Sequence, residues 1–146
     1  MSRITASEQA ERLRTAGLKA TGPRVAILDA VERNCKHPSA EDIYQELAES
    51  HPSLSLSTVY GTLSAFVKAG LVRKLSEFDG RLRVDGTNPP HDHAICRLCG
   101  AIFDIEPNLT HAPAPPSELP GGLAVLEMRI EYDVVCARCR PTIHLT

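Results

Sequence analysis

The chain has 146 residues, a formal net charge of −2 and 42% hydrophobic residues, which is enough for one ordinary domain or two small ones with buried cores. It contains no apolar run near the ~20 residues that a membrane span needs, and its N-terminus lacks the apolar segment of a secretory signal. We therefore expect a globular, cytoplasmic protein that does not enter a membrane.

Two helices are predicted before residue 35. Thr5-Ala6-Ser7-Glu8 has the form of a capping box, so a first helix begins there and runs to about Thr15, with Gly17 ending it. Thr21 caps a second helix, with Pro23 in its first turn, where no amide donor is missed. Its apolar residues recur at helical spacing and predict a buried side made of Val25, Ile27, Leu28 and Val31.

A third and a fourth helix are predicted between residues 39 and 70. Ser39 caps the third, with Asp42 three residues later and an inner face of Ile43 and Leu47. The fourth lies in SLSLSTVYGTLSAFVKAG, where Gly70 is placed to end it. Its buried side is expected to contain Val59, Leu63, Phe66 and Val67.

The opposite face of this fourth helix carries small or hydrogen-bonding residues, namely Ser57, Thr58, Tyr60, Gly61 and Ser64. A hairpin should follow, with strands in residues 71–77 and 81–85 around the turn Phe78-Asp79-Gly80. Helices followed by such a hairpin predict a winged helix, in which the second helix of the helix-turn-helix pair enters the major groove. The candidate DNA contacts are Ser57, Thr58 and Tyr60 on that helix, Arg81 and Arg83 on the wing, and Lys19 and Arg24 in the basic N-terminal part. A plain helical domain with one hairpin remains the alternative.

A second domain is expected after Thr87-Asn88-Pro89-Pro90, because consecutive prolines break helices and strands. The predicted organisation is thus a DNA-binding domain over 1–86, a linker over 87–90 and a second domain over 91–146. In this domain alternating apolar residues predict strands over 101–105 and 126–134. The proline-rich segment between them, 111–122, predicts a loop or one short helical turn.

Four of the five cysteines form two C-x-x-C pairs, a pattern that favours metal ligation over a disulfide framework. Each pair can bind the same ion from one side, and two pairs complete a tetrahedron. Four thiolates leave no open position, so the pattern predicts a structural Zn²⁺ ion, with a redox dithiol as the alternative. The ligands would be Cys96, Cys99, Cys136 and Cys139.

The neighbouring histidines predict a different metal site. His91 and His93 are two residues apart, so on an extended chain both project to one side, whereas Cys96 does not. Imidazole with carboxylate suits Fe²⁺, Mn²⁺, Zn²⁺, Ni²⁺ or Co²⁺. The further ligands must come from elsewhere, and the residues leave open a choice among Asp92, Asp104, Asp85, His37 and His111.

Several segments resemble the ferric uptake regulator (Fur) family of metal-responsive repressors, over nearly the whole chain. They are HPSAEDIYQEL (37–47), SLSTVYGTL (55–63), GLVRKL (70–75), HDHAICRLCG (91–100), AIFDIE (101–106) and CARC (136–139). The resemblance implies an α+β homodimer that binds operator DNA, each chain having an N-terminal winged helix and a C-terminal α/β dimerisation domain with a structural zinc site. It also implies a regulatory Fe²⁺ or Mn²⁺ site that straddles the linker and acts as co-repressor. Its ligands would be His37, Asp85, His91, His93 and Asp104.

Within the family, an aspartate at the position of Asp104 is similar to the peroxide-responsive branch, whereas iron sensors more often carry glutamate. That branch implies that hydrogen peroxide is the signal and that bound Fe²⁺ promotes oxidation of His37 and His91, which releases the operator. A sensor of iron, manganese or zinc availability without this chemistry is the nearest alternative. A metallohydrolase and a zinc-ribbon interaction module are further alternatives from other classes of protein.

Four positions depart from the family pattern. Many members have a basic or amide residue where Gly61 stands, and the proline-rich segment replaces a helix, which bears on the dimer interface. Met128 stands where a histidine often supports a third metal site, so no such site is expected. Cys35 has no counterpart with a family role, and we expect a structural thiol there, with a secondary redox role as the alternative.

Overall fold

The computed structural model describes residues 4–34, 37–75, 77, 79–86, 91–106 and 114–142. The chain divides into two compact units, residues 1–87 and 88–146, and each is described by itself. The predicted linker 87–90, Cys35 and His111 lie outside the described residues. No helix among the described ranges is both long and apolar enough to cross a membrane.

The first unit begins with two capped helices, as predicted. Helix α1 (Ala6–Thr15) starts at a capping box in which Thr5 and Glu8 bond each other's backbone amides, and Gly17 follows it with φ of 79°. Helix α2 (Gly22–Arg33) is capped by Thr21, whose hydroxyl accepts from the amide of Arg24. Both N-termini thus satisfy amides that have no partner within the helix.

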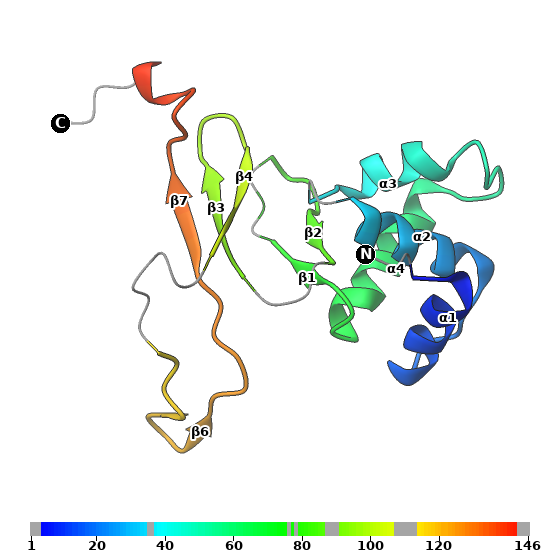
Figure 1. Ribbon diagram of the computed structural model, residues 1–146, viewed down its shortest axis with the longest axis horizontal. Coiled ribbons are helices and arrows are strands. Elements are labelled where there is room, and N and C mark those ends of the chain that lie inside the picture. Colours follow the sequence, from blue (N-terminus) through cyan, green and yellow to red (C-terminus); the bar gives the residue numbers. More distant parts are fainter. Residues whose placement is uncertain are drawn as a thin grey trace. The chain divides into compact units, whose positions relative to one another are not determined.

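Helices α3 (Ala40–Leu47) and α4 (Leu56–Lys68) complete the helical part of this unit (Figure 1). The predicted cap Ser39 forms a capping box with Asp42, and Ser55 caps α4. Gly70 has φ of 75° and ends α4, as expected of a residue in the left-handed region. The apolar sides of the four helices meet in one core, whose fully buried members include Leu13, Ile27, Leu28, Ile43, Val59, Leu63 and Phe66.

A small wing follows α4. Strands β1 (Arg73–Lys74) and β2 (Val84–Asp85) pair antiparallel, with Arg73 opposite Asp85. Each strand has two residues, fewer than the predicted runs of 71–77 and 81–85, although the N–H of Leu75 also donates to the carbonyl of Arg83 at 3.0 Å. Ser76, within the first run, lies outside the described residues. Gly80 has φ of 75° at the predicted turn. Four helices and this hairpin confirm the winged-helix arrangement.

The second unit is built on a three-stranded sheet with order β4-β3-β7. Strand β3 (Asp92–Cys96) lies in the middle, antiparallel to β4 (Ile102–Ile105) and parallel to β7 (Glu131–Val134). The prediction of a strand over 126–134 was wrong for its first half. Residues 126–130 are in no strand, and Leu126 is 98% exposed. Alternation alone does not make a strand, because a strand also needs a neighbour to pair with, and pairing with β3 begins only at Glu131.

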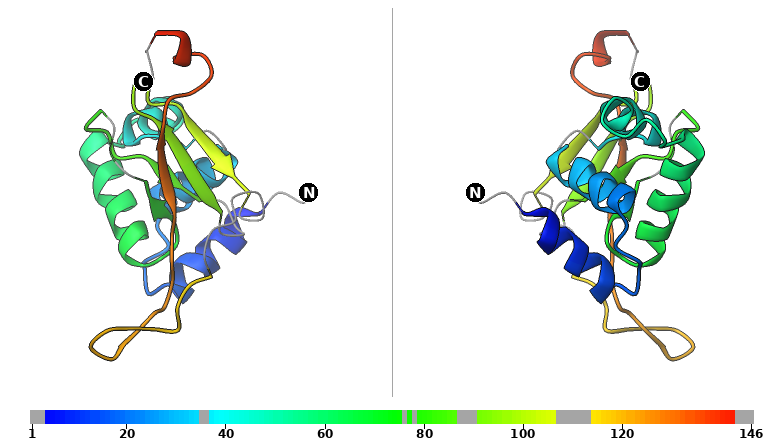
Figure 2. Two further views of the ribbon diagram at one scale, coloured as in Figure 1. Left: turned by 90° about the vertical axis from the view of Figure 1, so that its left-hand side faces the viewer. Right: turned by 90° about the vertical axis from the view of Figure 1, so that its right-hand side faces the viewer.

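A hairpin that was not predicted from the sequence begins in the proline-rich segment and ends just after it. Strands β5 (Glu118–Leu119) and β6 (Leu123–Ala124) pair antiparallel around Pro120-Gly121-Gly122. Both glycines have positive φ, 86° and 74°, which explains why this turn contains two of them. Figures 1 and 2 show this hairpin extending away from the three-stranded sheet.

Candidate metal centres and DNA-binding surface

The four cysteines of the two C-x-x-C pairs come together at one end of the second unit. Cys96 ends β3 and Cys136 follows β7, and because these strands are parallel neighbours both pairs meet at the same edge. The four sulfur atoms all lie within 4.8 Å of one another, and Sγ of Cys99 is 3.8 Å from Sγ of Cys136. This is the grouping that the sequence predicted, and it fits a structural zinc site.

The surroundings of the four thiols differ. The backbone N–H of Cys136 donates to Sγ of Cys96 at 3.4 Å, and this bond is the main cause that lowers the pKa of Cys96 to about 6. The side chains of Cys136 and Cys99 instead raise the pKa of Cys139 to about 12. In the absence of a cation the cluster therefore favours a thiolate at Cys96 and a thiol at Cys139. Hydrogen bonds to Cys136 and Cys99 are the main cause that keeps Cys139 protonated, and a divalent ion bound by all four sulfurs would displace that proton.

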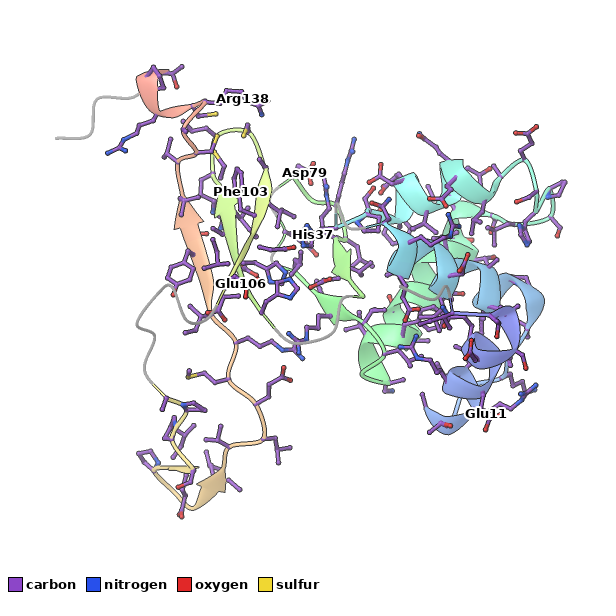
Figure 3. The ribbon with its side chains drawn as sticks, viewed as in Figure 1. Glu11, His37, Asp79, Phe103, Glu106 and Arg138 are labelled. Atoms are coloured by element: carbon purple, nitrogen blue, oxygen red, sulfur yellow. The ribbon has the colours of Figure 1, made fainter. Side chains whose placement is uncertain are left out.

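Arg138 is a further member of this cluster that sequence reasoning missed. Figure 3 shows it beside the sulfur atoms at the end of the sheet. The pKa of its guanidinium is raised by a hydrogen bond to Cys99 first, and by the charges of Cys99, Cys136 and Cys139. If the four cysteines held a divalent ion as thiolates, the cation of Arg138 would partly compensate their negative charge. The sequence did offer a signal for this role, because Arg138 is a basic residue between Cys136 and Cys139.

Two histidines and an aspartate of the second unit converge on one face of the sheet. His93 on β3 is the register partner of Asp104 on β4. Oδ1 of Asp104 lies 3.1 Å from Nε2 of His91 and 3.7 Å from Nε2 of His93, and the two imidazole centroids are 4.5 Å apart. His93 is buried, whereas Asp104 is half exposed. Asp92 lies between the histidines and, by strand alternation, faces the other side.

His37 and Asp85 lie opposite each other within the first unit. Ser39 forms an antiparallel bridge with Arg83, and the N–H of Val84 donates to the carbonyl of Pro38 at 3.2 Å. This register carried one step further sets His37 across from Asp85. Both are buried, with 6% and 4% of their surface exposed.

The backbone of His37 is strained. It has φ of 55°, and among the described residues it alone adopts positive φ without being glycine. Such a conformation is uncommon for a residue with a Cβ and persists only where the surroundings hold it. One contact that holds His37 in this conformation is the hydrogen bond that Nη1 of Arg83 donates to its carbonyl, at 3.3 Å.

The residues predicted to contact DNA are distributed as follows. Ser57 and Thr58 on α4 and Arg81 on the wing are exposed, and Arg83 is half buried. Tyr60 is also half buried, and its hydroxyl donates to Glu41. In the N-terminal part, Arg24 donates to the carbonyl of Lys19 at 3.2 Å.

Gly61 also lies on the exposed face of α4. A β-carbon added there would meet no atom within 4 Å, so packing inside the chain does not require a glycine. Replacing Gly61 with alanine is expected to raise the free energy of unfolding by about 1 kcal/mol, because glycine is the poorer helix former. Urea denaturation checks this. The matched control, Gly70→Ala, should lower the stability, since Gly70 has φ of 75°.

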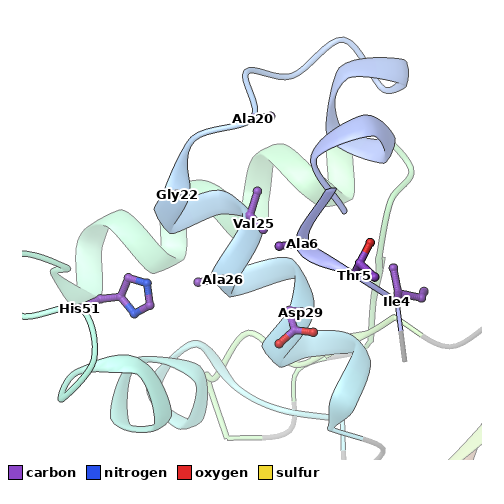
Figure 4. Close-up of a pocket in the computed structure, with 9 residues that line it drawn as sticks. All are labelled: Ile4, Thr5, Ala6, Ala20, Gly22, Val25, Ala26, Asp29 and His51. Carbon is purple, nitrogen blue, oxygen red and sulfur yellow. The ribbon is translucent and has the colours of Figure 1, made fainter. Parts of the chain in front are cut away.

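A pocket of about 690 Å³ lies between α1 and α2 (Figure 4). Its polar lining includes Asp29, His51 and Thr5. The carboxylate of Asp29 accepts from Nε of Arg33 at 2.7 Å, and the hydroxyl of Thr5 is bonded to Glu8. In Figure 4, Asp29 and His51 lie on separate walls of the pocket. A hydrolase needs a nucleophile and a base within hydrogen-bonding reach of each other, and these two residues do not form such a pair.

Comparison with known proteins agrees with the arrangement of helices, wing and metal-binding clusters. The sequence profile of the Ferric uptake regulator family matches residues 15–133. The chain belongs to this family. It is therefore a metal-responsive transcriptional regulator and not an enzyme, so the metallohydrolase alternative is wrong. Family membership also confirms the resemblance drawn from the sequence.

Individual relatives cover most of the chain. The Peroxide operon regulator of Bacillus subtilis is 36% identical over 133 residues, which are 90% of this chain and 91% of that protein. The Transcriptional regulator FurA of Mycobacterium tuberculosis is 35% identical over 133 residues, 90% of each chain. The structure is similar to that of the ferric uptake regulator from Pseudomonas aeruginosa with manganese, with a TM-score of 0.73 and 29% identity over 88% of this chain and 98% of that one.

Proposed function

We propose that this protein is a cytoplasmic, metal-dependent repressor that binds operator DNA as a homodimer and releases it after hydrogen peroxide oxidises its histidine ligands. The observation that carries the proposal is the position of Asp104, whose carboxylate lies against the imidazoles of His91 and His93. Aspartate at this position resembles the peroxide-responsive branch of the family. The similarity to the Peroxide operon regulator of Bacillus subtilis supports the same branch.

The proposed metals are one Zn²⁺ and one Fe²⁺ or Mn²⁺ per chain. Zn²⁺ would bind the four cysteines, because four thiolates within 4.8 Å of one another suit a closed tetrahedral site. The regulatory ion would bind three imidazoles and two carboxylates, a donor set that suits Fe²⁺ or Mn²⁺. The proposed ligands are His37 and Asp85 of the first unit with His91, His93 and Asp104 of the second.

The proposed switch depends on the loss of ligands. Bound Fe²⁺ supplies redox chemistry toward peroxide that Mn²⁺ does not. At His37 and His91 the net change inserts one peroxide oxygen into a ring C–H bond, and the other oxygen leaves as water. An oxidised ring is a poorer ligand, so the two units are no longer held by a shared ion and the affinity for the operator falls.

Exposed apolar residues support a homodimer formed by the second unit. Six of the seven large hydrophobic residues that are exposed among the described residues lie in that unit. They are Leu98, Phe103, Leu119, Leu123, Leu126 and Met128. A single chain rarely exposes so many in one small unit without a partner. The winged helix of each chain would then bind one half-site of the operator.

Peptide mass spectrometry after peroxide treatment tests the proposed signal. The Fe²⁺-loaded protein is expected to gain one oxygen atom in the peptides that contain His37 and His91, in step with loss of duplex binding. The Mn²⁺-loaded protein is the matched control. Its two histidine peptides should gain no oxygen, and it should stay bound to the duplex. Asp104→Glu should gain oxygen more slowly.

The second candidate is a sensor of metal availability, favoured by the similarity to FurA and to the manganese-containing regulator of Pseudomonas aeruginosa. Unmodified histidine peptides and persistent DNA binding in the Fe²⁺-loaded, peroxide-treated protein would support that candidate. An unchanged oxidation rate in Asp104→Glu would also count against the peroxide proposal.

A further inference from the structure

Tyr60 occupies a boundary between the proposed recognition helix and the wing. It lines a cleft of about 390 Å³ whose other walls include Ser64 and Lys68 from α4 and Lys74 and Gly80 from the wing segment. In a winged helix both of these elements approach the DNA. The orientation of the Tyr60 ring therefore affects which atoms the first unit presents to a duplex.

The hydroxyl of Tyr60 is held by a carboxylate from another helix. It donates to Oε1 of Glu41, in the first turn of α3, at 2.6 Å. This bond is the largest cause that lowers the pKa of Glu41 and the largest that raises the pKa of Tyr60. Both directions favour the same state, a carboxylate that accepts from a neutral phenol. A short hydrogen bond to a charged acceptor is among the stronger kinds in proteins.

The same carboxylate has weaker contacts besides its bond to Tyr60. Hydrogen bonds from its own backbone N–H and from the side chain of Ser39 also lower its pKa, while its buried second oxygen, Oε2, has no partner of good geometry among the described residues. A buried acceptor without a partner costs stability. The nearby Arg81 acts on this carboxylate through its charge, which lowers the pKa of Glu41, while its guanidinium also lies near Asp79, with Nε 3.7 Å from Oδ2. The bond to Tyr60 has the largest effect of these contacts, and it fixes one end of the Tyr60 ring.

We propose that Glu41 is a positioning residue that holds Tyr60 in one orientation and thereby sets how well α4 distinguishes one base sequence from another. The inference rests on the proposed binding of DNA by α4. A phenol fixed at its hydroxyl and at its Cα keeps one rotamer, so its contacts with a base edge are the same in every complex. A ring that turns freely fits several sequences almost equally.

The test measures sequence discrimination in variants of the Mn²⁺-loaded full-length protein. Wild-type protein first selects duplexes from a library with a randomised central segment. The ratio of its affinities for the selected duplex and for a shuffled duplex of the same composition is then compared with that of Glu41→Ala. The expected loss in this ratio is about tenfold, the size of one hydrogen bond to a charged group. Glu41→Gln should keep most of the ratio, because its amide oxygen still accepts from the phenol.

A double-mutant cycle separates positioning from a structural role of α3. In Tyr60→Phe protein, which lacks the hydroxyl, Glu41→Ala is expected to change the ratio no further. Glu46→Ala is the matched control, since Glu46 lies on the same helix but pairs with Nη2 of Arg33 at 2.8 Å, and its ratio should equal that of the wild type.

Three results would overturn the inference. An undiminished ratio in Glu41→Ala refutes the positioning role, as does an equal loss in the Tyr60→Phe background. If the wild-type protein enriches no sequence, the DNA-binding proposal fails together with this one. If the wild type enriches a sequence and Glu41→Ala discriminates as well as the wild type, the positioning role of Glu41 is refuted while the DNA-binding proposal stands.

Discussion

Replacing Cys96 with alanine is expected to abolish zinc binding and unfold the second unit, while the first unit stays folded. Cys96 is fully buried at the end of β3, and its sulfur lies in a cluster with the sulfurs of Cys99, Cys136 and Cys139. Structural zinc contributes about 10–16 kcal/mol in small zinc-binding peptides. That is as large as the entire stability of most domains. The cysteines bring β3 and β7 together, so we expect the three-stranded sheet to unfold when the stabilisation by zinc is removed.

Zinc content and amide hydrogen exchange measure this expectation. The Cys96→Ala protein should contain no zinc, and the amides of β3, β4 and β7 should exchange as in an unfolded chain, while those of α2 and α4 remain protected. Cys35→Ala supplies the matched control, since it removes the fifth cysteine and should leave one zinc per chain. Protected β3 amides in zinc-free Cys96→Ala would contradict a structural role for the metal.

Replacing His93 with alanine is expected to reduce the affinity for Mn²⁺ at least about 100-fold and, with it, metal-dependent binding to DNA. The reason is geometric. His93 is the register partner of Asp104, and its imidazole lies 4.5 Å from that of His91, so its removal opens the centre of the cluster. Side chains that only orient a metal ligand contribute roughly 10- to 100-fold to the metal affinity, and a direct ligand contributes at least as much.

Asp92 offers a control one residue away. It lies on the opposite side of β3, so Asp92→Ala should bind Mn²⁺ and duplex DNA as the wild type does. Calorimetry gives the Mn²⁺ affinity, and fluorescence anisotropy at one fixed salt concentration gives the affinity for the duplex. Equal Mn²⁺ affinities for His93→Ala and wild type would exclude His93 as a ligand. A loss in Asp92→Ala as large as that in His93→Ala would show that the strand as a whole had been disturbed.

Local signals predicted much of the first unit and part of the candidate sites. The caps at Thr5, Thr21 and Ser39 depend on residues within four positions of one another, and the sequence displays such pairs directly. The same holds for the turn at Gly80 and for the pairing of cysteines in each C-x-x-C. The choice of Asp104 over Asp92 came from the family resemblance. In the structure, the register between β3 and β4 puts Asp104 opposite His93.

Features that depend on distant partners were not predicted. The segment 126–130 alternates like a strand, yet pairing with β3 begins only at Glu131, so Leu126 and Met128 stay exposed. The hairpin of β5 and β6 was hidden because prolines nearby suggested a loop, whereas the informative residues were the two glycines of its turn. The bond from Tyr60 to Glu41 joins two helices, and no spacing along the chain reveals it.

The parallel pairing of β3 and β7 has a consequence for the order in which the chain folds. Residues that pair in this ladder, such as His93 and Glu131, are separated by the whole proline-rich segment, and a long loop must close before any of these bonds forms. The contacts among α1 to α4 join helices that follow one another closely. We therefore expect the first unit to fold quickly after synthesis and the second to wait for loop closure. Zinc that holds the first cysteine pair when the second arrives would accelerate this closure, so metal supply would limit how fast new repressor matures.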